Sequence, residues 1–123
     1  MRFTFNKQEK LKSKKLIERL FTEGKSISCN PLKLIYLKVG HDSNFLIQAG
    51  VSVAKRKINL AVSRNRIKRL MREVYRKNKH LIYEGINTKY IFMFLYLDEK
   101  EQKYVFIEEK MINLLEKFLK KHD

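Results

Sequence analysis

The sequence is poor in the residues that build covalent or metal-linked scaffolds. It has a single cysteine, Cys29, so it cannot form an internal disulfide framework or a cysteine-rich metal site. We expect Cys29 to be a small side chain in a buried or half-buried position. The three histidines, His41, His80 and His122, are scattered, and none has a cysteine or carboxylate partner at metal-ligand spacing. The sequence therefore predicts no metal site in the protein.

Acidic residues are also scarce, with 13 Asp and Glu against 28 Lys and Arg, which gives a net charge of +15. The one acidic cluster, Asp98, Glu99 and Glu101, lies in the stretch "DEKEQK", which is typical of a solvated connector. A phosphodiesterase that works alone needs convergent carboxylates or histidines to hold metal or to move protons. We therefore predict no catalytic residues and no bound cofactor in the chain itself.

Long apolar runs are absent as well, since no stretch approaches the ~20 residues of a membrane span. The N-terminal stretch "MRFTFNKQEKLKSKK" lacks the continuous apolar block of a secretory signal, which indicates a cytoplasmic protein. The 123 residues are 44% hydrophobic and show no repeat or linker composition. We therefore expect one packed domain spanning residues 1–123.

The apolar periodicity predicts an α+β fold, a small four-stranded sheet with packed helices in the order αβββαβα. The first predicted helix begins at a Ser13 cap and ends at Gly24, and strands follow at 26–29, 32–39 and 45–54. A long helix runs from an Asn59 cap to about His80, and a further strand spans 89–97. The last helix is predicted to bury Ile107, Met111, Leu114, Leu115 and Phe118. The 89–97 strand is apolar on both faces, which is typical of a strand in the sheet interior.

The positive charge is concentrated in one segment. Residues 55–80 contain eleven Lys or Arg and one acid, Glu73, a net charge of +10 in 26 residues. On a helical wheel, one side carries an apolar stripe and the opposite side is cationic, with Arg64 and Arg66 between them. The apolar stripe is Ile67, Leu70, Met71 and Val74, and the cationic side is Asn65, Lys68, Arg69, Arg72 and Arg76.

A mixed charge run is usually a solvated face, but this one is nearly unmixed. Like charges four residues apart cost a few tenths of a kcal/mol each, a cost that bound phosphates relieve. Arg outnumbers Lys five to two in residues 61–77, which favours forked contacts with phosphate over loose attraction to lipid. The cationic side also lacks the bulky apolar residues of a membrane-surface helix. We predict that it binds nucleic acid and not a membrane; the residue types leave DNA and RNA both open.

The stretch "KRKINLAVSRNRIKRLMRE", residues 55–73, resembles the signature of the bacterial ribonuclease P protein family. That signature is Arg-Asn-Arg followed by a basic pair and a further Arg, which correspond to Arg64, Asn65, Arg66, Lys68, Arg69 and Arg72. The stretch "AGVSVAKRK" resembles the family's strand that ends in a basic pair, and "LKSKKLIERLFTEGKSI" resembles its first helix. The resemblance extends from about Phe3 to about Tyr96, and the last helix agrees only in character.

The resemblance implies an RNA-based endonuclease that removes the 5′ leader from precursor tRNA. Its RNA subunit would carry the active site and the magnesium ions, and the protein would bind both the catalytic RNA and the leader. The implied catalytic-RNA contacts are Arg64, Asn65, Arg66, Lys68, Arg69, Arg72 and Arg76. The implied leader contacts, in a cleft between the first helix and the sheet, are Ile17, Phe21, Tyr36, Lys55 and Arg56. A left-handed crossover around the long helix is also implied, against the usual right-handed rule.

The sequence also allows other roles for these residues and for the chain. Phe21 and Tyr36 also fit as core residues. Ile17 stands where many family members have an aromatic residue, so one base-stacking contact, worth about 1 to 3 kcal/mol, would be missing. A general RNA-binding or ribosome-associated module without a processing role, or a DNA-binding regulator, would carry a similar basic helix. We expect the free protein to be a monomer or a weak dimer.

Overall fold

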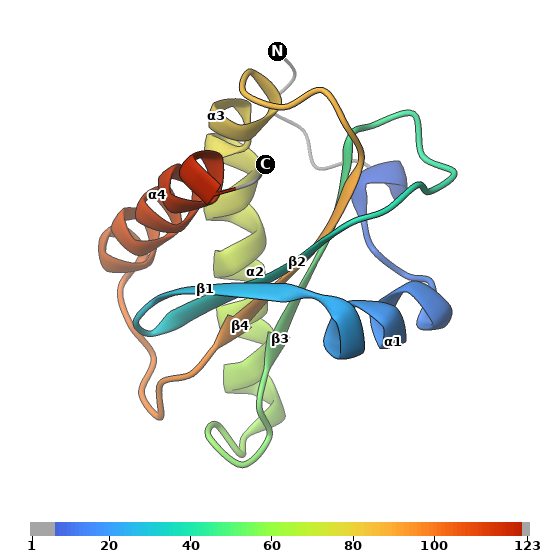
Figure 1. Ribbon diagram of the computed structural model, residues 1–123. Coiled ribbons are helices and arrows are strands. Elements are labelled where there is room, and N and C mark those ends of the chain that lie inside the picture. Colours follow the sequence, from blue (N-terminus) through green and yellow to red (C-terminus); the bar gives the residue numbers. More distant parts are fainter. Residues whose placement is uncertain (1–6, 122–123) are drawn as a thin grey trace.

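The structure, a computed structural model, describes residues 7–121 as one four-stranded sheet with helices on both faces (Figure 1). The elements are η1 (Lys7–Glu9), α1 (Lys14–Glu23), β1 (Lys25–Cys29), β2 (Leu32–Lys38), β3 (Ile47–Val53), α2 (Ala61–Asn78), α3 (His80–Tyr83), β4 (Tyr90–Tyr96) and α4 (Tyr104–Lys121). The predicted α+β class and four-stranded sheet are confirmed. The order differs from αβββαβα by two short helical segments, η1 and α3. Phe3 and His122 lie outside the described residues.

The sheet has the strand order β1-β2-β4-β3. The β1–β2 and β2–β4 pairs are antiparallel, whereas β3 and β4 are parallel. The central strand β4 is buried along its length except at Leu95, which is half-buried, so the prediction of an interior strand covered on both faces is confirmed. The chain passes from β3 to β4 through α2 and α3; the left hand of this crossover stays a prediction.

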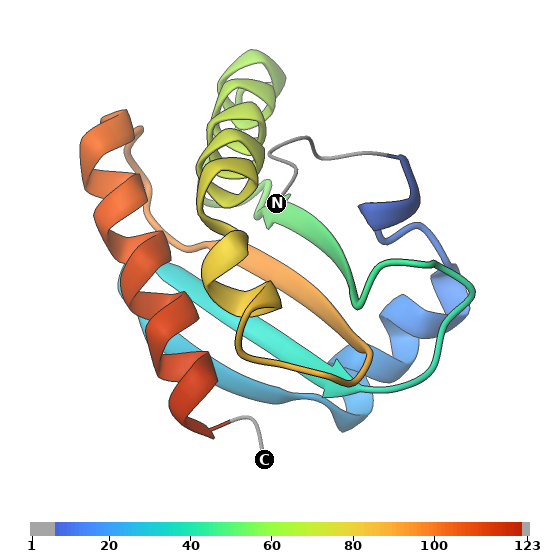
Figure 2. The same cartoon turned by 90° about the horizontal axis from the view of Figure 1, so that it is seen from above.

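One face of the sheet is covered by α2 and α4, and the opposite face by α1 (Figure 2). On the first face the ring centroid of Phe118, on α4, lies 4.8 Å from that of Phe92, 5.0 Å from that of Tyr36 and 5.1 Å from that of Tyr90. All five apolar residues predicted to face inward on the last helix are fully buried. On the second face, α1 packs Leu20 into a smaller cluster, so the two faces are covered unequally.

The predicted ends of α1 are confirmed. The Ser13 hydroxyl accepts a hydrogen bond from the backbone N–H of Leu16 at 3.2 Å, which caps the first turn. At the other end the N–H of Gly24 donates to the carbonyl of Leu20 at 2.9 Å. A Cβ at Gly24 would lie 2.3 Å from that same oxygen, so only glycine allows the chain to turn this closely from α1 into β1.

The predicted Asn59 cap of the long helix is wrong. The N-cap of α2 is Leu60, and no side chain caps the helix there. Instead the guanidinium of Arg64 donates from Nη1 to the carbonyls of Ile58 and Asn59, both at 3.0 Å. Arg64 therefore holds the segment before the helix against the first turn of α2, where no side chain caps the helix.

A buried ion pair joins η1 to the end of α2. The Nζ of Lys79 lies 2.6 Å and 2.7 Å from the two carboxylate oxygens of Glu9, and both residues are 1% exposed. The Tyr83 hydroxyl donates to the same carboxylate at 2.9 Å. Burial, together with this carboxylate, raises the pKa of Tyr83 well above its ordinary value. The pair holds the N-terminal segment next to β3, where Lys10 forms an isolated parallel β-bridge with Ala49.

We expect Lys79→Met to lower the free energy of unfolding by about 3 to 5 kcal/mol, because it leaves the Glu9 carboxylate buried without its cation. Urea unfolding followed by circular dichroism measures this loss. The matched control is Lys120→Met, which removes an exposed lysine on α4 and should change stability by less than about 0.5 kcal/mol. Equal, small losses in the two variants would show that the buried pair contributes nothing to the fold.

Candidate nucleic-acid interface

The long helix α2 has one apolar and one basic side, as predicted. Ile67, Met71 and Val74 are buried against the sheet, together with Tyr75, which was not predicted. Leu70 is half-buried and packs on the same core. The opposite side carries the α2 basic stripe, which consists of Asn65, Lys68, Arg69, Arg72 and Arg76. Asn65 and Arg76 lie eleven residues apart, so the stripe extends over roughly 17 Å of helix.

Two of the predicted arginines are held by carboxylates within the protein. The Nη1 of Arg66 lies 2.9 Å and 3.0 Å from the two carboxylate oxygens of Glu101, in the connector before α4. Arg76 donates to Glu73, three residues earlier, at 2.6 Å and 3.1 Å. This hydrogen bond lowers the pKa of the Glu73 carboxyl. The Arg66–Glu101 pair is solvent-exposed, so it contributes little stability and yields readily to a competing anion, whereas the Arg76–Glu73 pair is partly buried.

The centre of the stripe is not neutralised. Within residues 7–121, no carboxylate lies within 4.0 Å of the charged groups of Lys68, Arg69 or Arg72. Arg69 and Arg72 are also exposed, and Lys68 is half-buried. Their mutual repulsion is therefore unrelieved in the free protein, and an arrangement of this kind attracts a polyanion.

A second surface lies on the opposite face of the sheet, beside α1. Ile17 and Phe21 are four residues apart and so occupy the same flank of that helix. Ile17 is half-buried against the small core, whereas the Phe21 side chain is 51% exposed. Next to them the sheet carries Lys33, Leu95 and Ser52, which lie in register on three adjacent strands and are all half-buried. We call these three residues the open strip.

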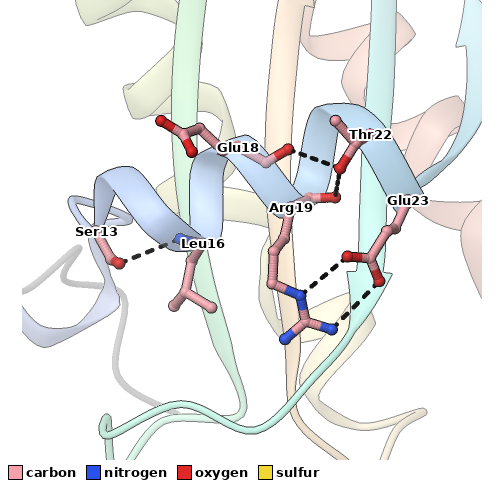
Figure 3. A network of polar contacts seen from close by, with 6 residues as sticks. All are labelled: Ser13, Leu16, Glu18, Arg19, Thr22 and Glu23. Carbon is pink, nitrogen blue, oxygen red and sulfur yellow. Dashed lines mark hydrogen bonds and ion pairs between the residues drawn. The ribbon is translucent and has the colours of Figure 1, made fainter.

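The other flank of α1 shows which way Phe21 points. Arg19 donates to Glu23 at 3.2 Å and 3.3 Å, and Figure 3 shows the two side chains together on that flank. Glu23 lines a hollow with Leu37 and Lys38, at the C-terminal end of β2. The flank with Phe21 therefore faces the opposite end of the sheet, toward the open strip at the start of β2.

The prediction that Tyr36 shares a surface with Phe21 is wrong. Tyr36 is 6% exposed and packs its ring edge-on against Phe118, on the face covered by α2 and α4. Burial raises the pKa of its hydroxyl, as expected for a core tyrosine. Its neighbour Ile35 points to the α1 side and packs in the small core there. Successive residues of a strand face opposite sides of the sheet, so Ile35 and Tyr36 lie on different surfaces although they are adjacent in sequence.

Lys55 and Arg56 lie where β3 leads into α2, and both are exposed. Val53, the last residue of β3, pairs with Tyr96, so this connection leaves the sheet at the same end as the open strip. It is visible at the bottom of Figure 1. Lys55 and Arg56 therefore lie at the end of the sheet that the α1 flank with Ile17 and Phe21 faces, and Tyr36 lies on the other face of the sheet. The open strip and Glu101 were missed by the sequence prediction.

Residues 7–121 show neither a metal-binding cluster nor a membrane-spanning helix. No three His, Cys, Asp or Glu side chains converge there in a way that would hold a metal ion. None of the described helices combines the length and apolar character needed to span a bilayer.

Comparison with known proteins identifies related sequences. The family described as Ribonuclease P matches residues 5–119. The chain is 38% identical to the ribonuclease P protein component of Porphyromonas gingivalis over 91 residues, which cover 73% of this chain and 66% of that protein, just under two thirds of its length. It is 32% identical to the ribonuclease P protein component of Thermotoga maritima over 115 residues, which cover 93% of this chain and 95% of that protein.

Solved structures of ribonuclease P proteins share the fold of this chain. The ribonuclease P protein of Thermotoga maritima matches with a TM-score of 0.71 at 24% identity, covering 89% of this chain and 96% of that one. The corresponding protein of Staphylococcus aureus matches with a TM-score of 0.69 at 20% identity, covering 88% of this chain and 93% of that one. At these identities the likeness establishes a shared fold.

The two aromatic residues predicted at the leader site should differ sharply in their effect on stability. We expect Tyr36→Ala to cost about 3 kcal/mol or more in unfolding free energy, because it empties a space beside Phe118 in the core. Phe21→Ala should cost about 1 kcal/mol or less, since half of that side chain is already in solvent. Thermal and urea unfolding measure both. A larger loss for Phe21→Ala than for Tyr36→Ala would contradict this assignment of core and surface.

Proposed function

The chain belongs to the ribonuclease P protein family, and we propose that it acts as the protein subunit of that RNA-based endonuclease. In this role it binds the catalytic RNA and the 5′ leader of precursor tRNA, and it assists removal of the leader. The RNA subunit carries the active site and its magnesium ions, and the complex works in the cytoplasm. The protein contributes no catalytic group and no cofactor of its own.

The α2 basic stripe is the observation that carries this proposal. Arg69 and Arg72 are exposed without a carboxylate partner among the described residues, so their charge is available to an external anion. Guanidinium groups bind phosphate through two parallel hydrogen bonds, which suits the backbone of a folded RNA. Arg64 and Arg66 at the start of α2 extend this surface toward the β3–α2 connection. Arg66 exchanges its Glu101 partner for phosphate when the RNA binds.

The surface beside α1 suits a single-stranded leader. Phe21 offers a half-exposed ring on which a base can stack, and Lys33 places a positive charge on the adjoining open strip. Lys55 and Arg56 stand near the same end of the sheet and bind the leader phosphates. Ile17 supplies apolar contact without a π-face. Tyr36 supports this surface only from within the core, where it packs on the opposite side of the sheet.

We expect the protein, reconstituted with a bacterial ribonuclease P RNA at low magnesium, to stimulate leader removal from a precursor tRNA. Arg69→Ala should weaken binding to that RNA and reduce the slope of log affinity against log salt by roughly one, because one phosphate contact is lost. Lys120→Ala removes an equal charge from the far end of α4 and should leave both values unchanged. No stimulation at any magnesium concentration would exclude the proposed function and leave the alternative of a general RNA-binding module.

Substrate discrimination tests the second surface separately. Phe21→Ala should lower the preference for precursor over mature tRNA by roughly tenfold, as expected for one lost stacking contact, while assembly with the catalytic RNA is retained. Val105→Ala is the control, since it truncates an apolar side chain that is 74% exposed on α4. Equilibrium binding of the two tRNAs to the assembled complex measures the preference. Parallel behaviour of the two variants would show that Phe21 does not contact the leader.

A further inference from the structure

A hollow of about 410 Å³ lies between α2 and the start of α4. Its lining residues come from α2, from the connector before α4 and from the first residue of α4: Arg66, Ile67, Arg69, Leu70, Glu73, Glu101, Gln102 and Tyr104. The hollow is on the side of α2 that faces α4, so it adjoins the α2 basic stripe through Arg69. It is separate from the open strip, which lies on the other face of the sheet.

The lining combines an apolar floor with a charged rim. Ile67 and Leu70 contribute aliphatic surface, and Tyr104 contributes an aromatic ring. The ammonium group of Lys77 lies 5.4 Å from the centroid of that ring, so a cation already stands beside it. The Tyr104 hydroxyl is buried and has no hydrogen-bond partner among residues 7–121. Because this oxygen is closed to solvent, a ligand in the hollow meets the ring of Tyr104 and not its hydroxyl.

We propose that this hollow receives one unstacked nucleotide of the RNA that binds α2. The base lies over Leu70 and the ring of Tyr104. The flanking phosphates bind Arg66 and Arg69 at the rim. The inference rests on the proposed function and extends it, because it assigns a base contact to a helix for which only phosphate contacts were predicted.

The chemistry of the rim selects a nucleotide over other apolar ligands. An apolar protein segment would bury the guanidinium group of Arg69, which has no carboxylate within 4.0 Å among residues 7–121, without a counter-charge, at a high cost in desolvation. A nucleotide carries a planar apolar ring and an anionic backbone side by side, which matches the floor and the rim together. Unstacked RNA bases bind in this manner, on aromatic side chains with arginine nearby.

Glu101 occupies Arg66 at the rim of this hollow in the free protein. It holds Arg66 through both carboxylate oxygens, and both residues line the hollow. The pair is exposed to solvent, with 61% of the Arg66 side chain and 36% of the Glu101 side chain accessible, so it is weak. Arg66 uses a single nitrogen, Nη1, for both bonds to Glu101, so an incoming phosphate can displace this carboxylate and accept two parallel hydrogen bonds from the guanidinium group.

Ultraviolet cross-linking of the full-length protein to a bacterial ribonuclease P RNA transcript tests the site without any substitution. After digestion with ribonuclease and trypsin, we expect a nucleotide attached to the peptide that contains Tyr104. Tyr104→Ala should weaken binding to the transcript roughly tenfold and leave the salt slope unchanged, because a stacking contact and no phosphate contact is lost. Tyr104→Phe, which keeps the ring, should bind within threefold of the wild type. Glu101→Gln should tighten binding, because Arg66 is then free for phosphate.

The outcomes separate this site from the proposed function. If the wild-type protein binds the transcript and stimulates leader removal, but no cross-link forms at Tyr104 and Tyr104→Ala binds normally, the nucleotide site is refuted and the function stands. If the wild type binds this transcript no better than an unrelated RNA, the function itself fails. If the free protein sediments as a dimer and Tyr104→Ala makes it monomeric, the hollow is an interface between two copies, which also refutes the site.

Discussion

The fold depends on covering both faces of the apolar strand β4. Its alternating side chains leave no face that water can wet, so helices must pack on each side of the sheet. One face is filled by α2 and α4 around the aromatic cluster of Phe92 and Phe118. The other is covered by the single ten-residue helix α1, which leaves part of the sheet half-exposed. The open strip is a direct result of this unequal cover.

The same packing decides where the positive charge can go. The apolar side of α2 is held against the sheet by Ile67 and Met71, so the basic side must face solvent. Carboxylates on the neighbouring connector and on α2 itself satisfy Arg66 and Arg76. No carboxylate within the described part of the chain reaches Arg69 or Arg72. The protein therefore neutralises the edges of its basic surface and leaves the centre charged, an arrangement that favours an external polyanion without making the free helix unstable.

Sequence patterns predicted the elements that follow a local rule. The 3.6-residue period oriented α2 and α4 correctly, and Ser13 and Gly24 marked the ends of α1 through capping chemistry that involves only near neighbours. The alternation in residues 32–39 predicted a strand but not which of its faces α1 covers, so the leader role that the family resemblance implied for Tyr36 could not be checked against the sequence. The buried pair of Glu9 and Lys79 joins residues seventy positions apart, and no local pattern signals a contact of that kind.

The connection from β3 to α2 ties the two candidate surfaces together. Residues 54–60 leave the sheet at the end that carries the open strip and enter the helix that carries the basic stripe. Arg64 links this connection to the first turn of α2 through hydrogen bonds to the backbone carbonyls of Ile58 and Asn59. The helix with the α2 basic stripe and the sheet with the open strip are therefore joined directly by this short connection. In the proposed complex, a leader strand on the open strip would therefore lie at a distance from the RNA on α2 that is set by the packed sheet and not by a linker.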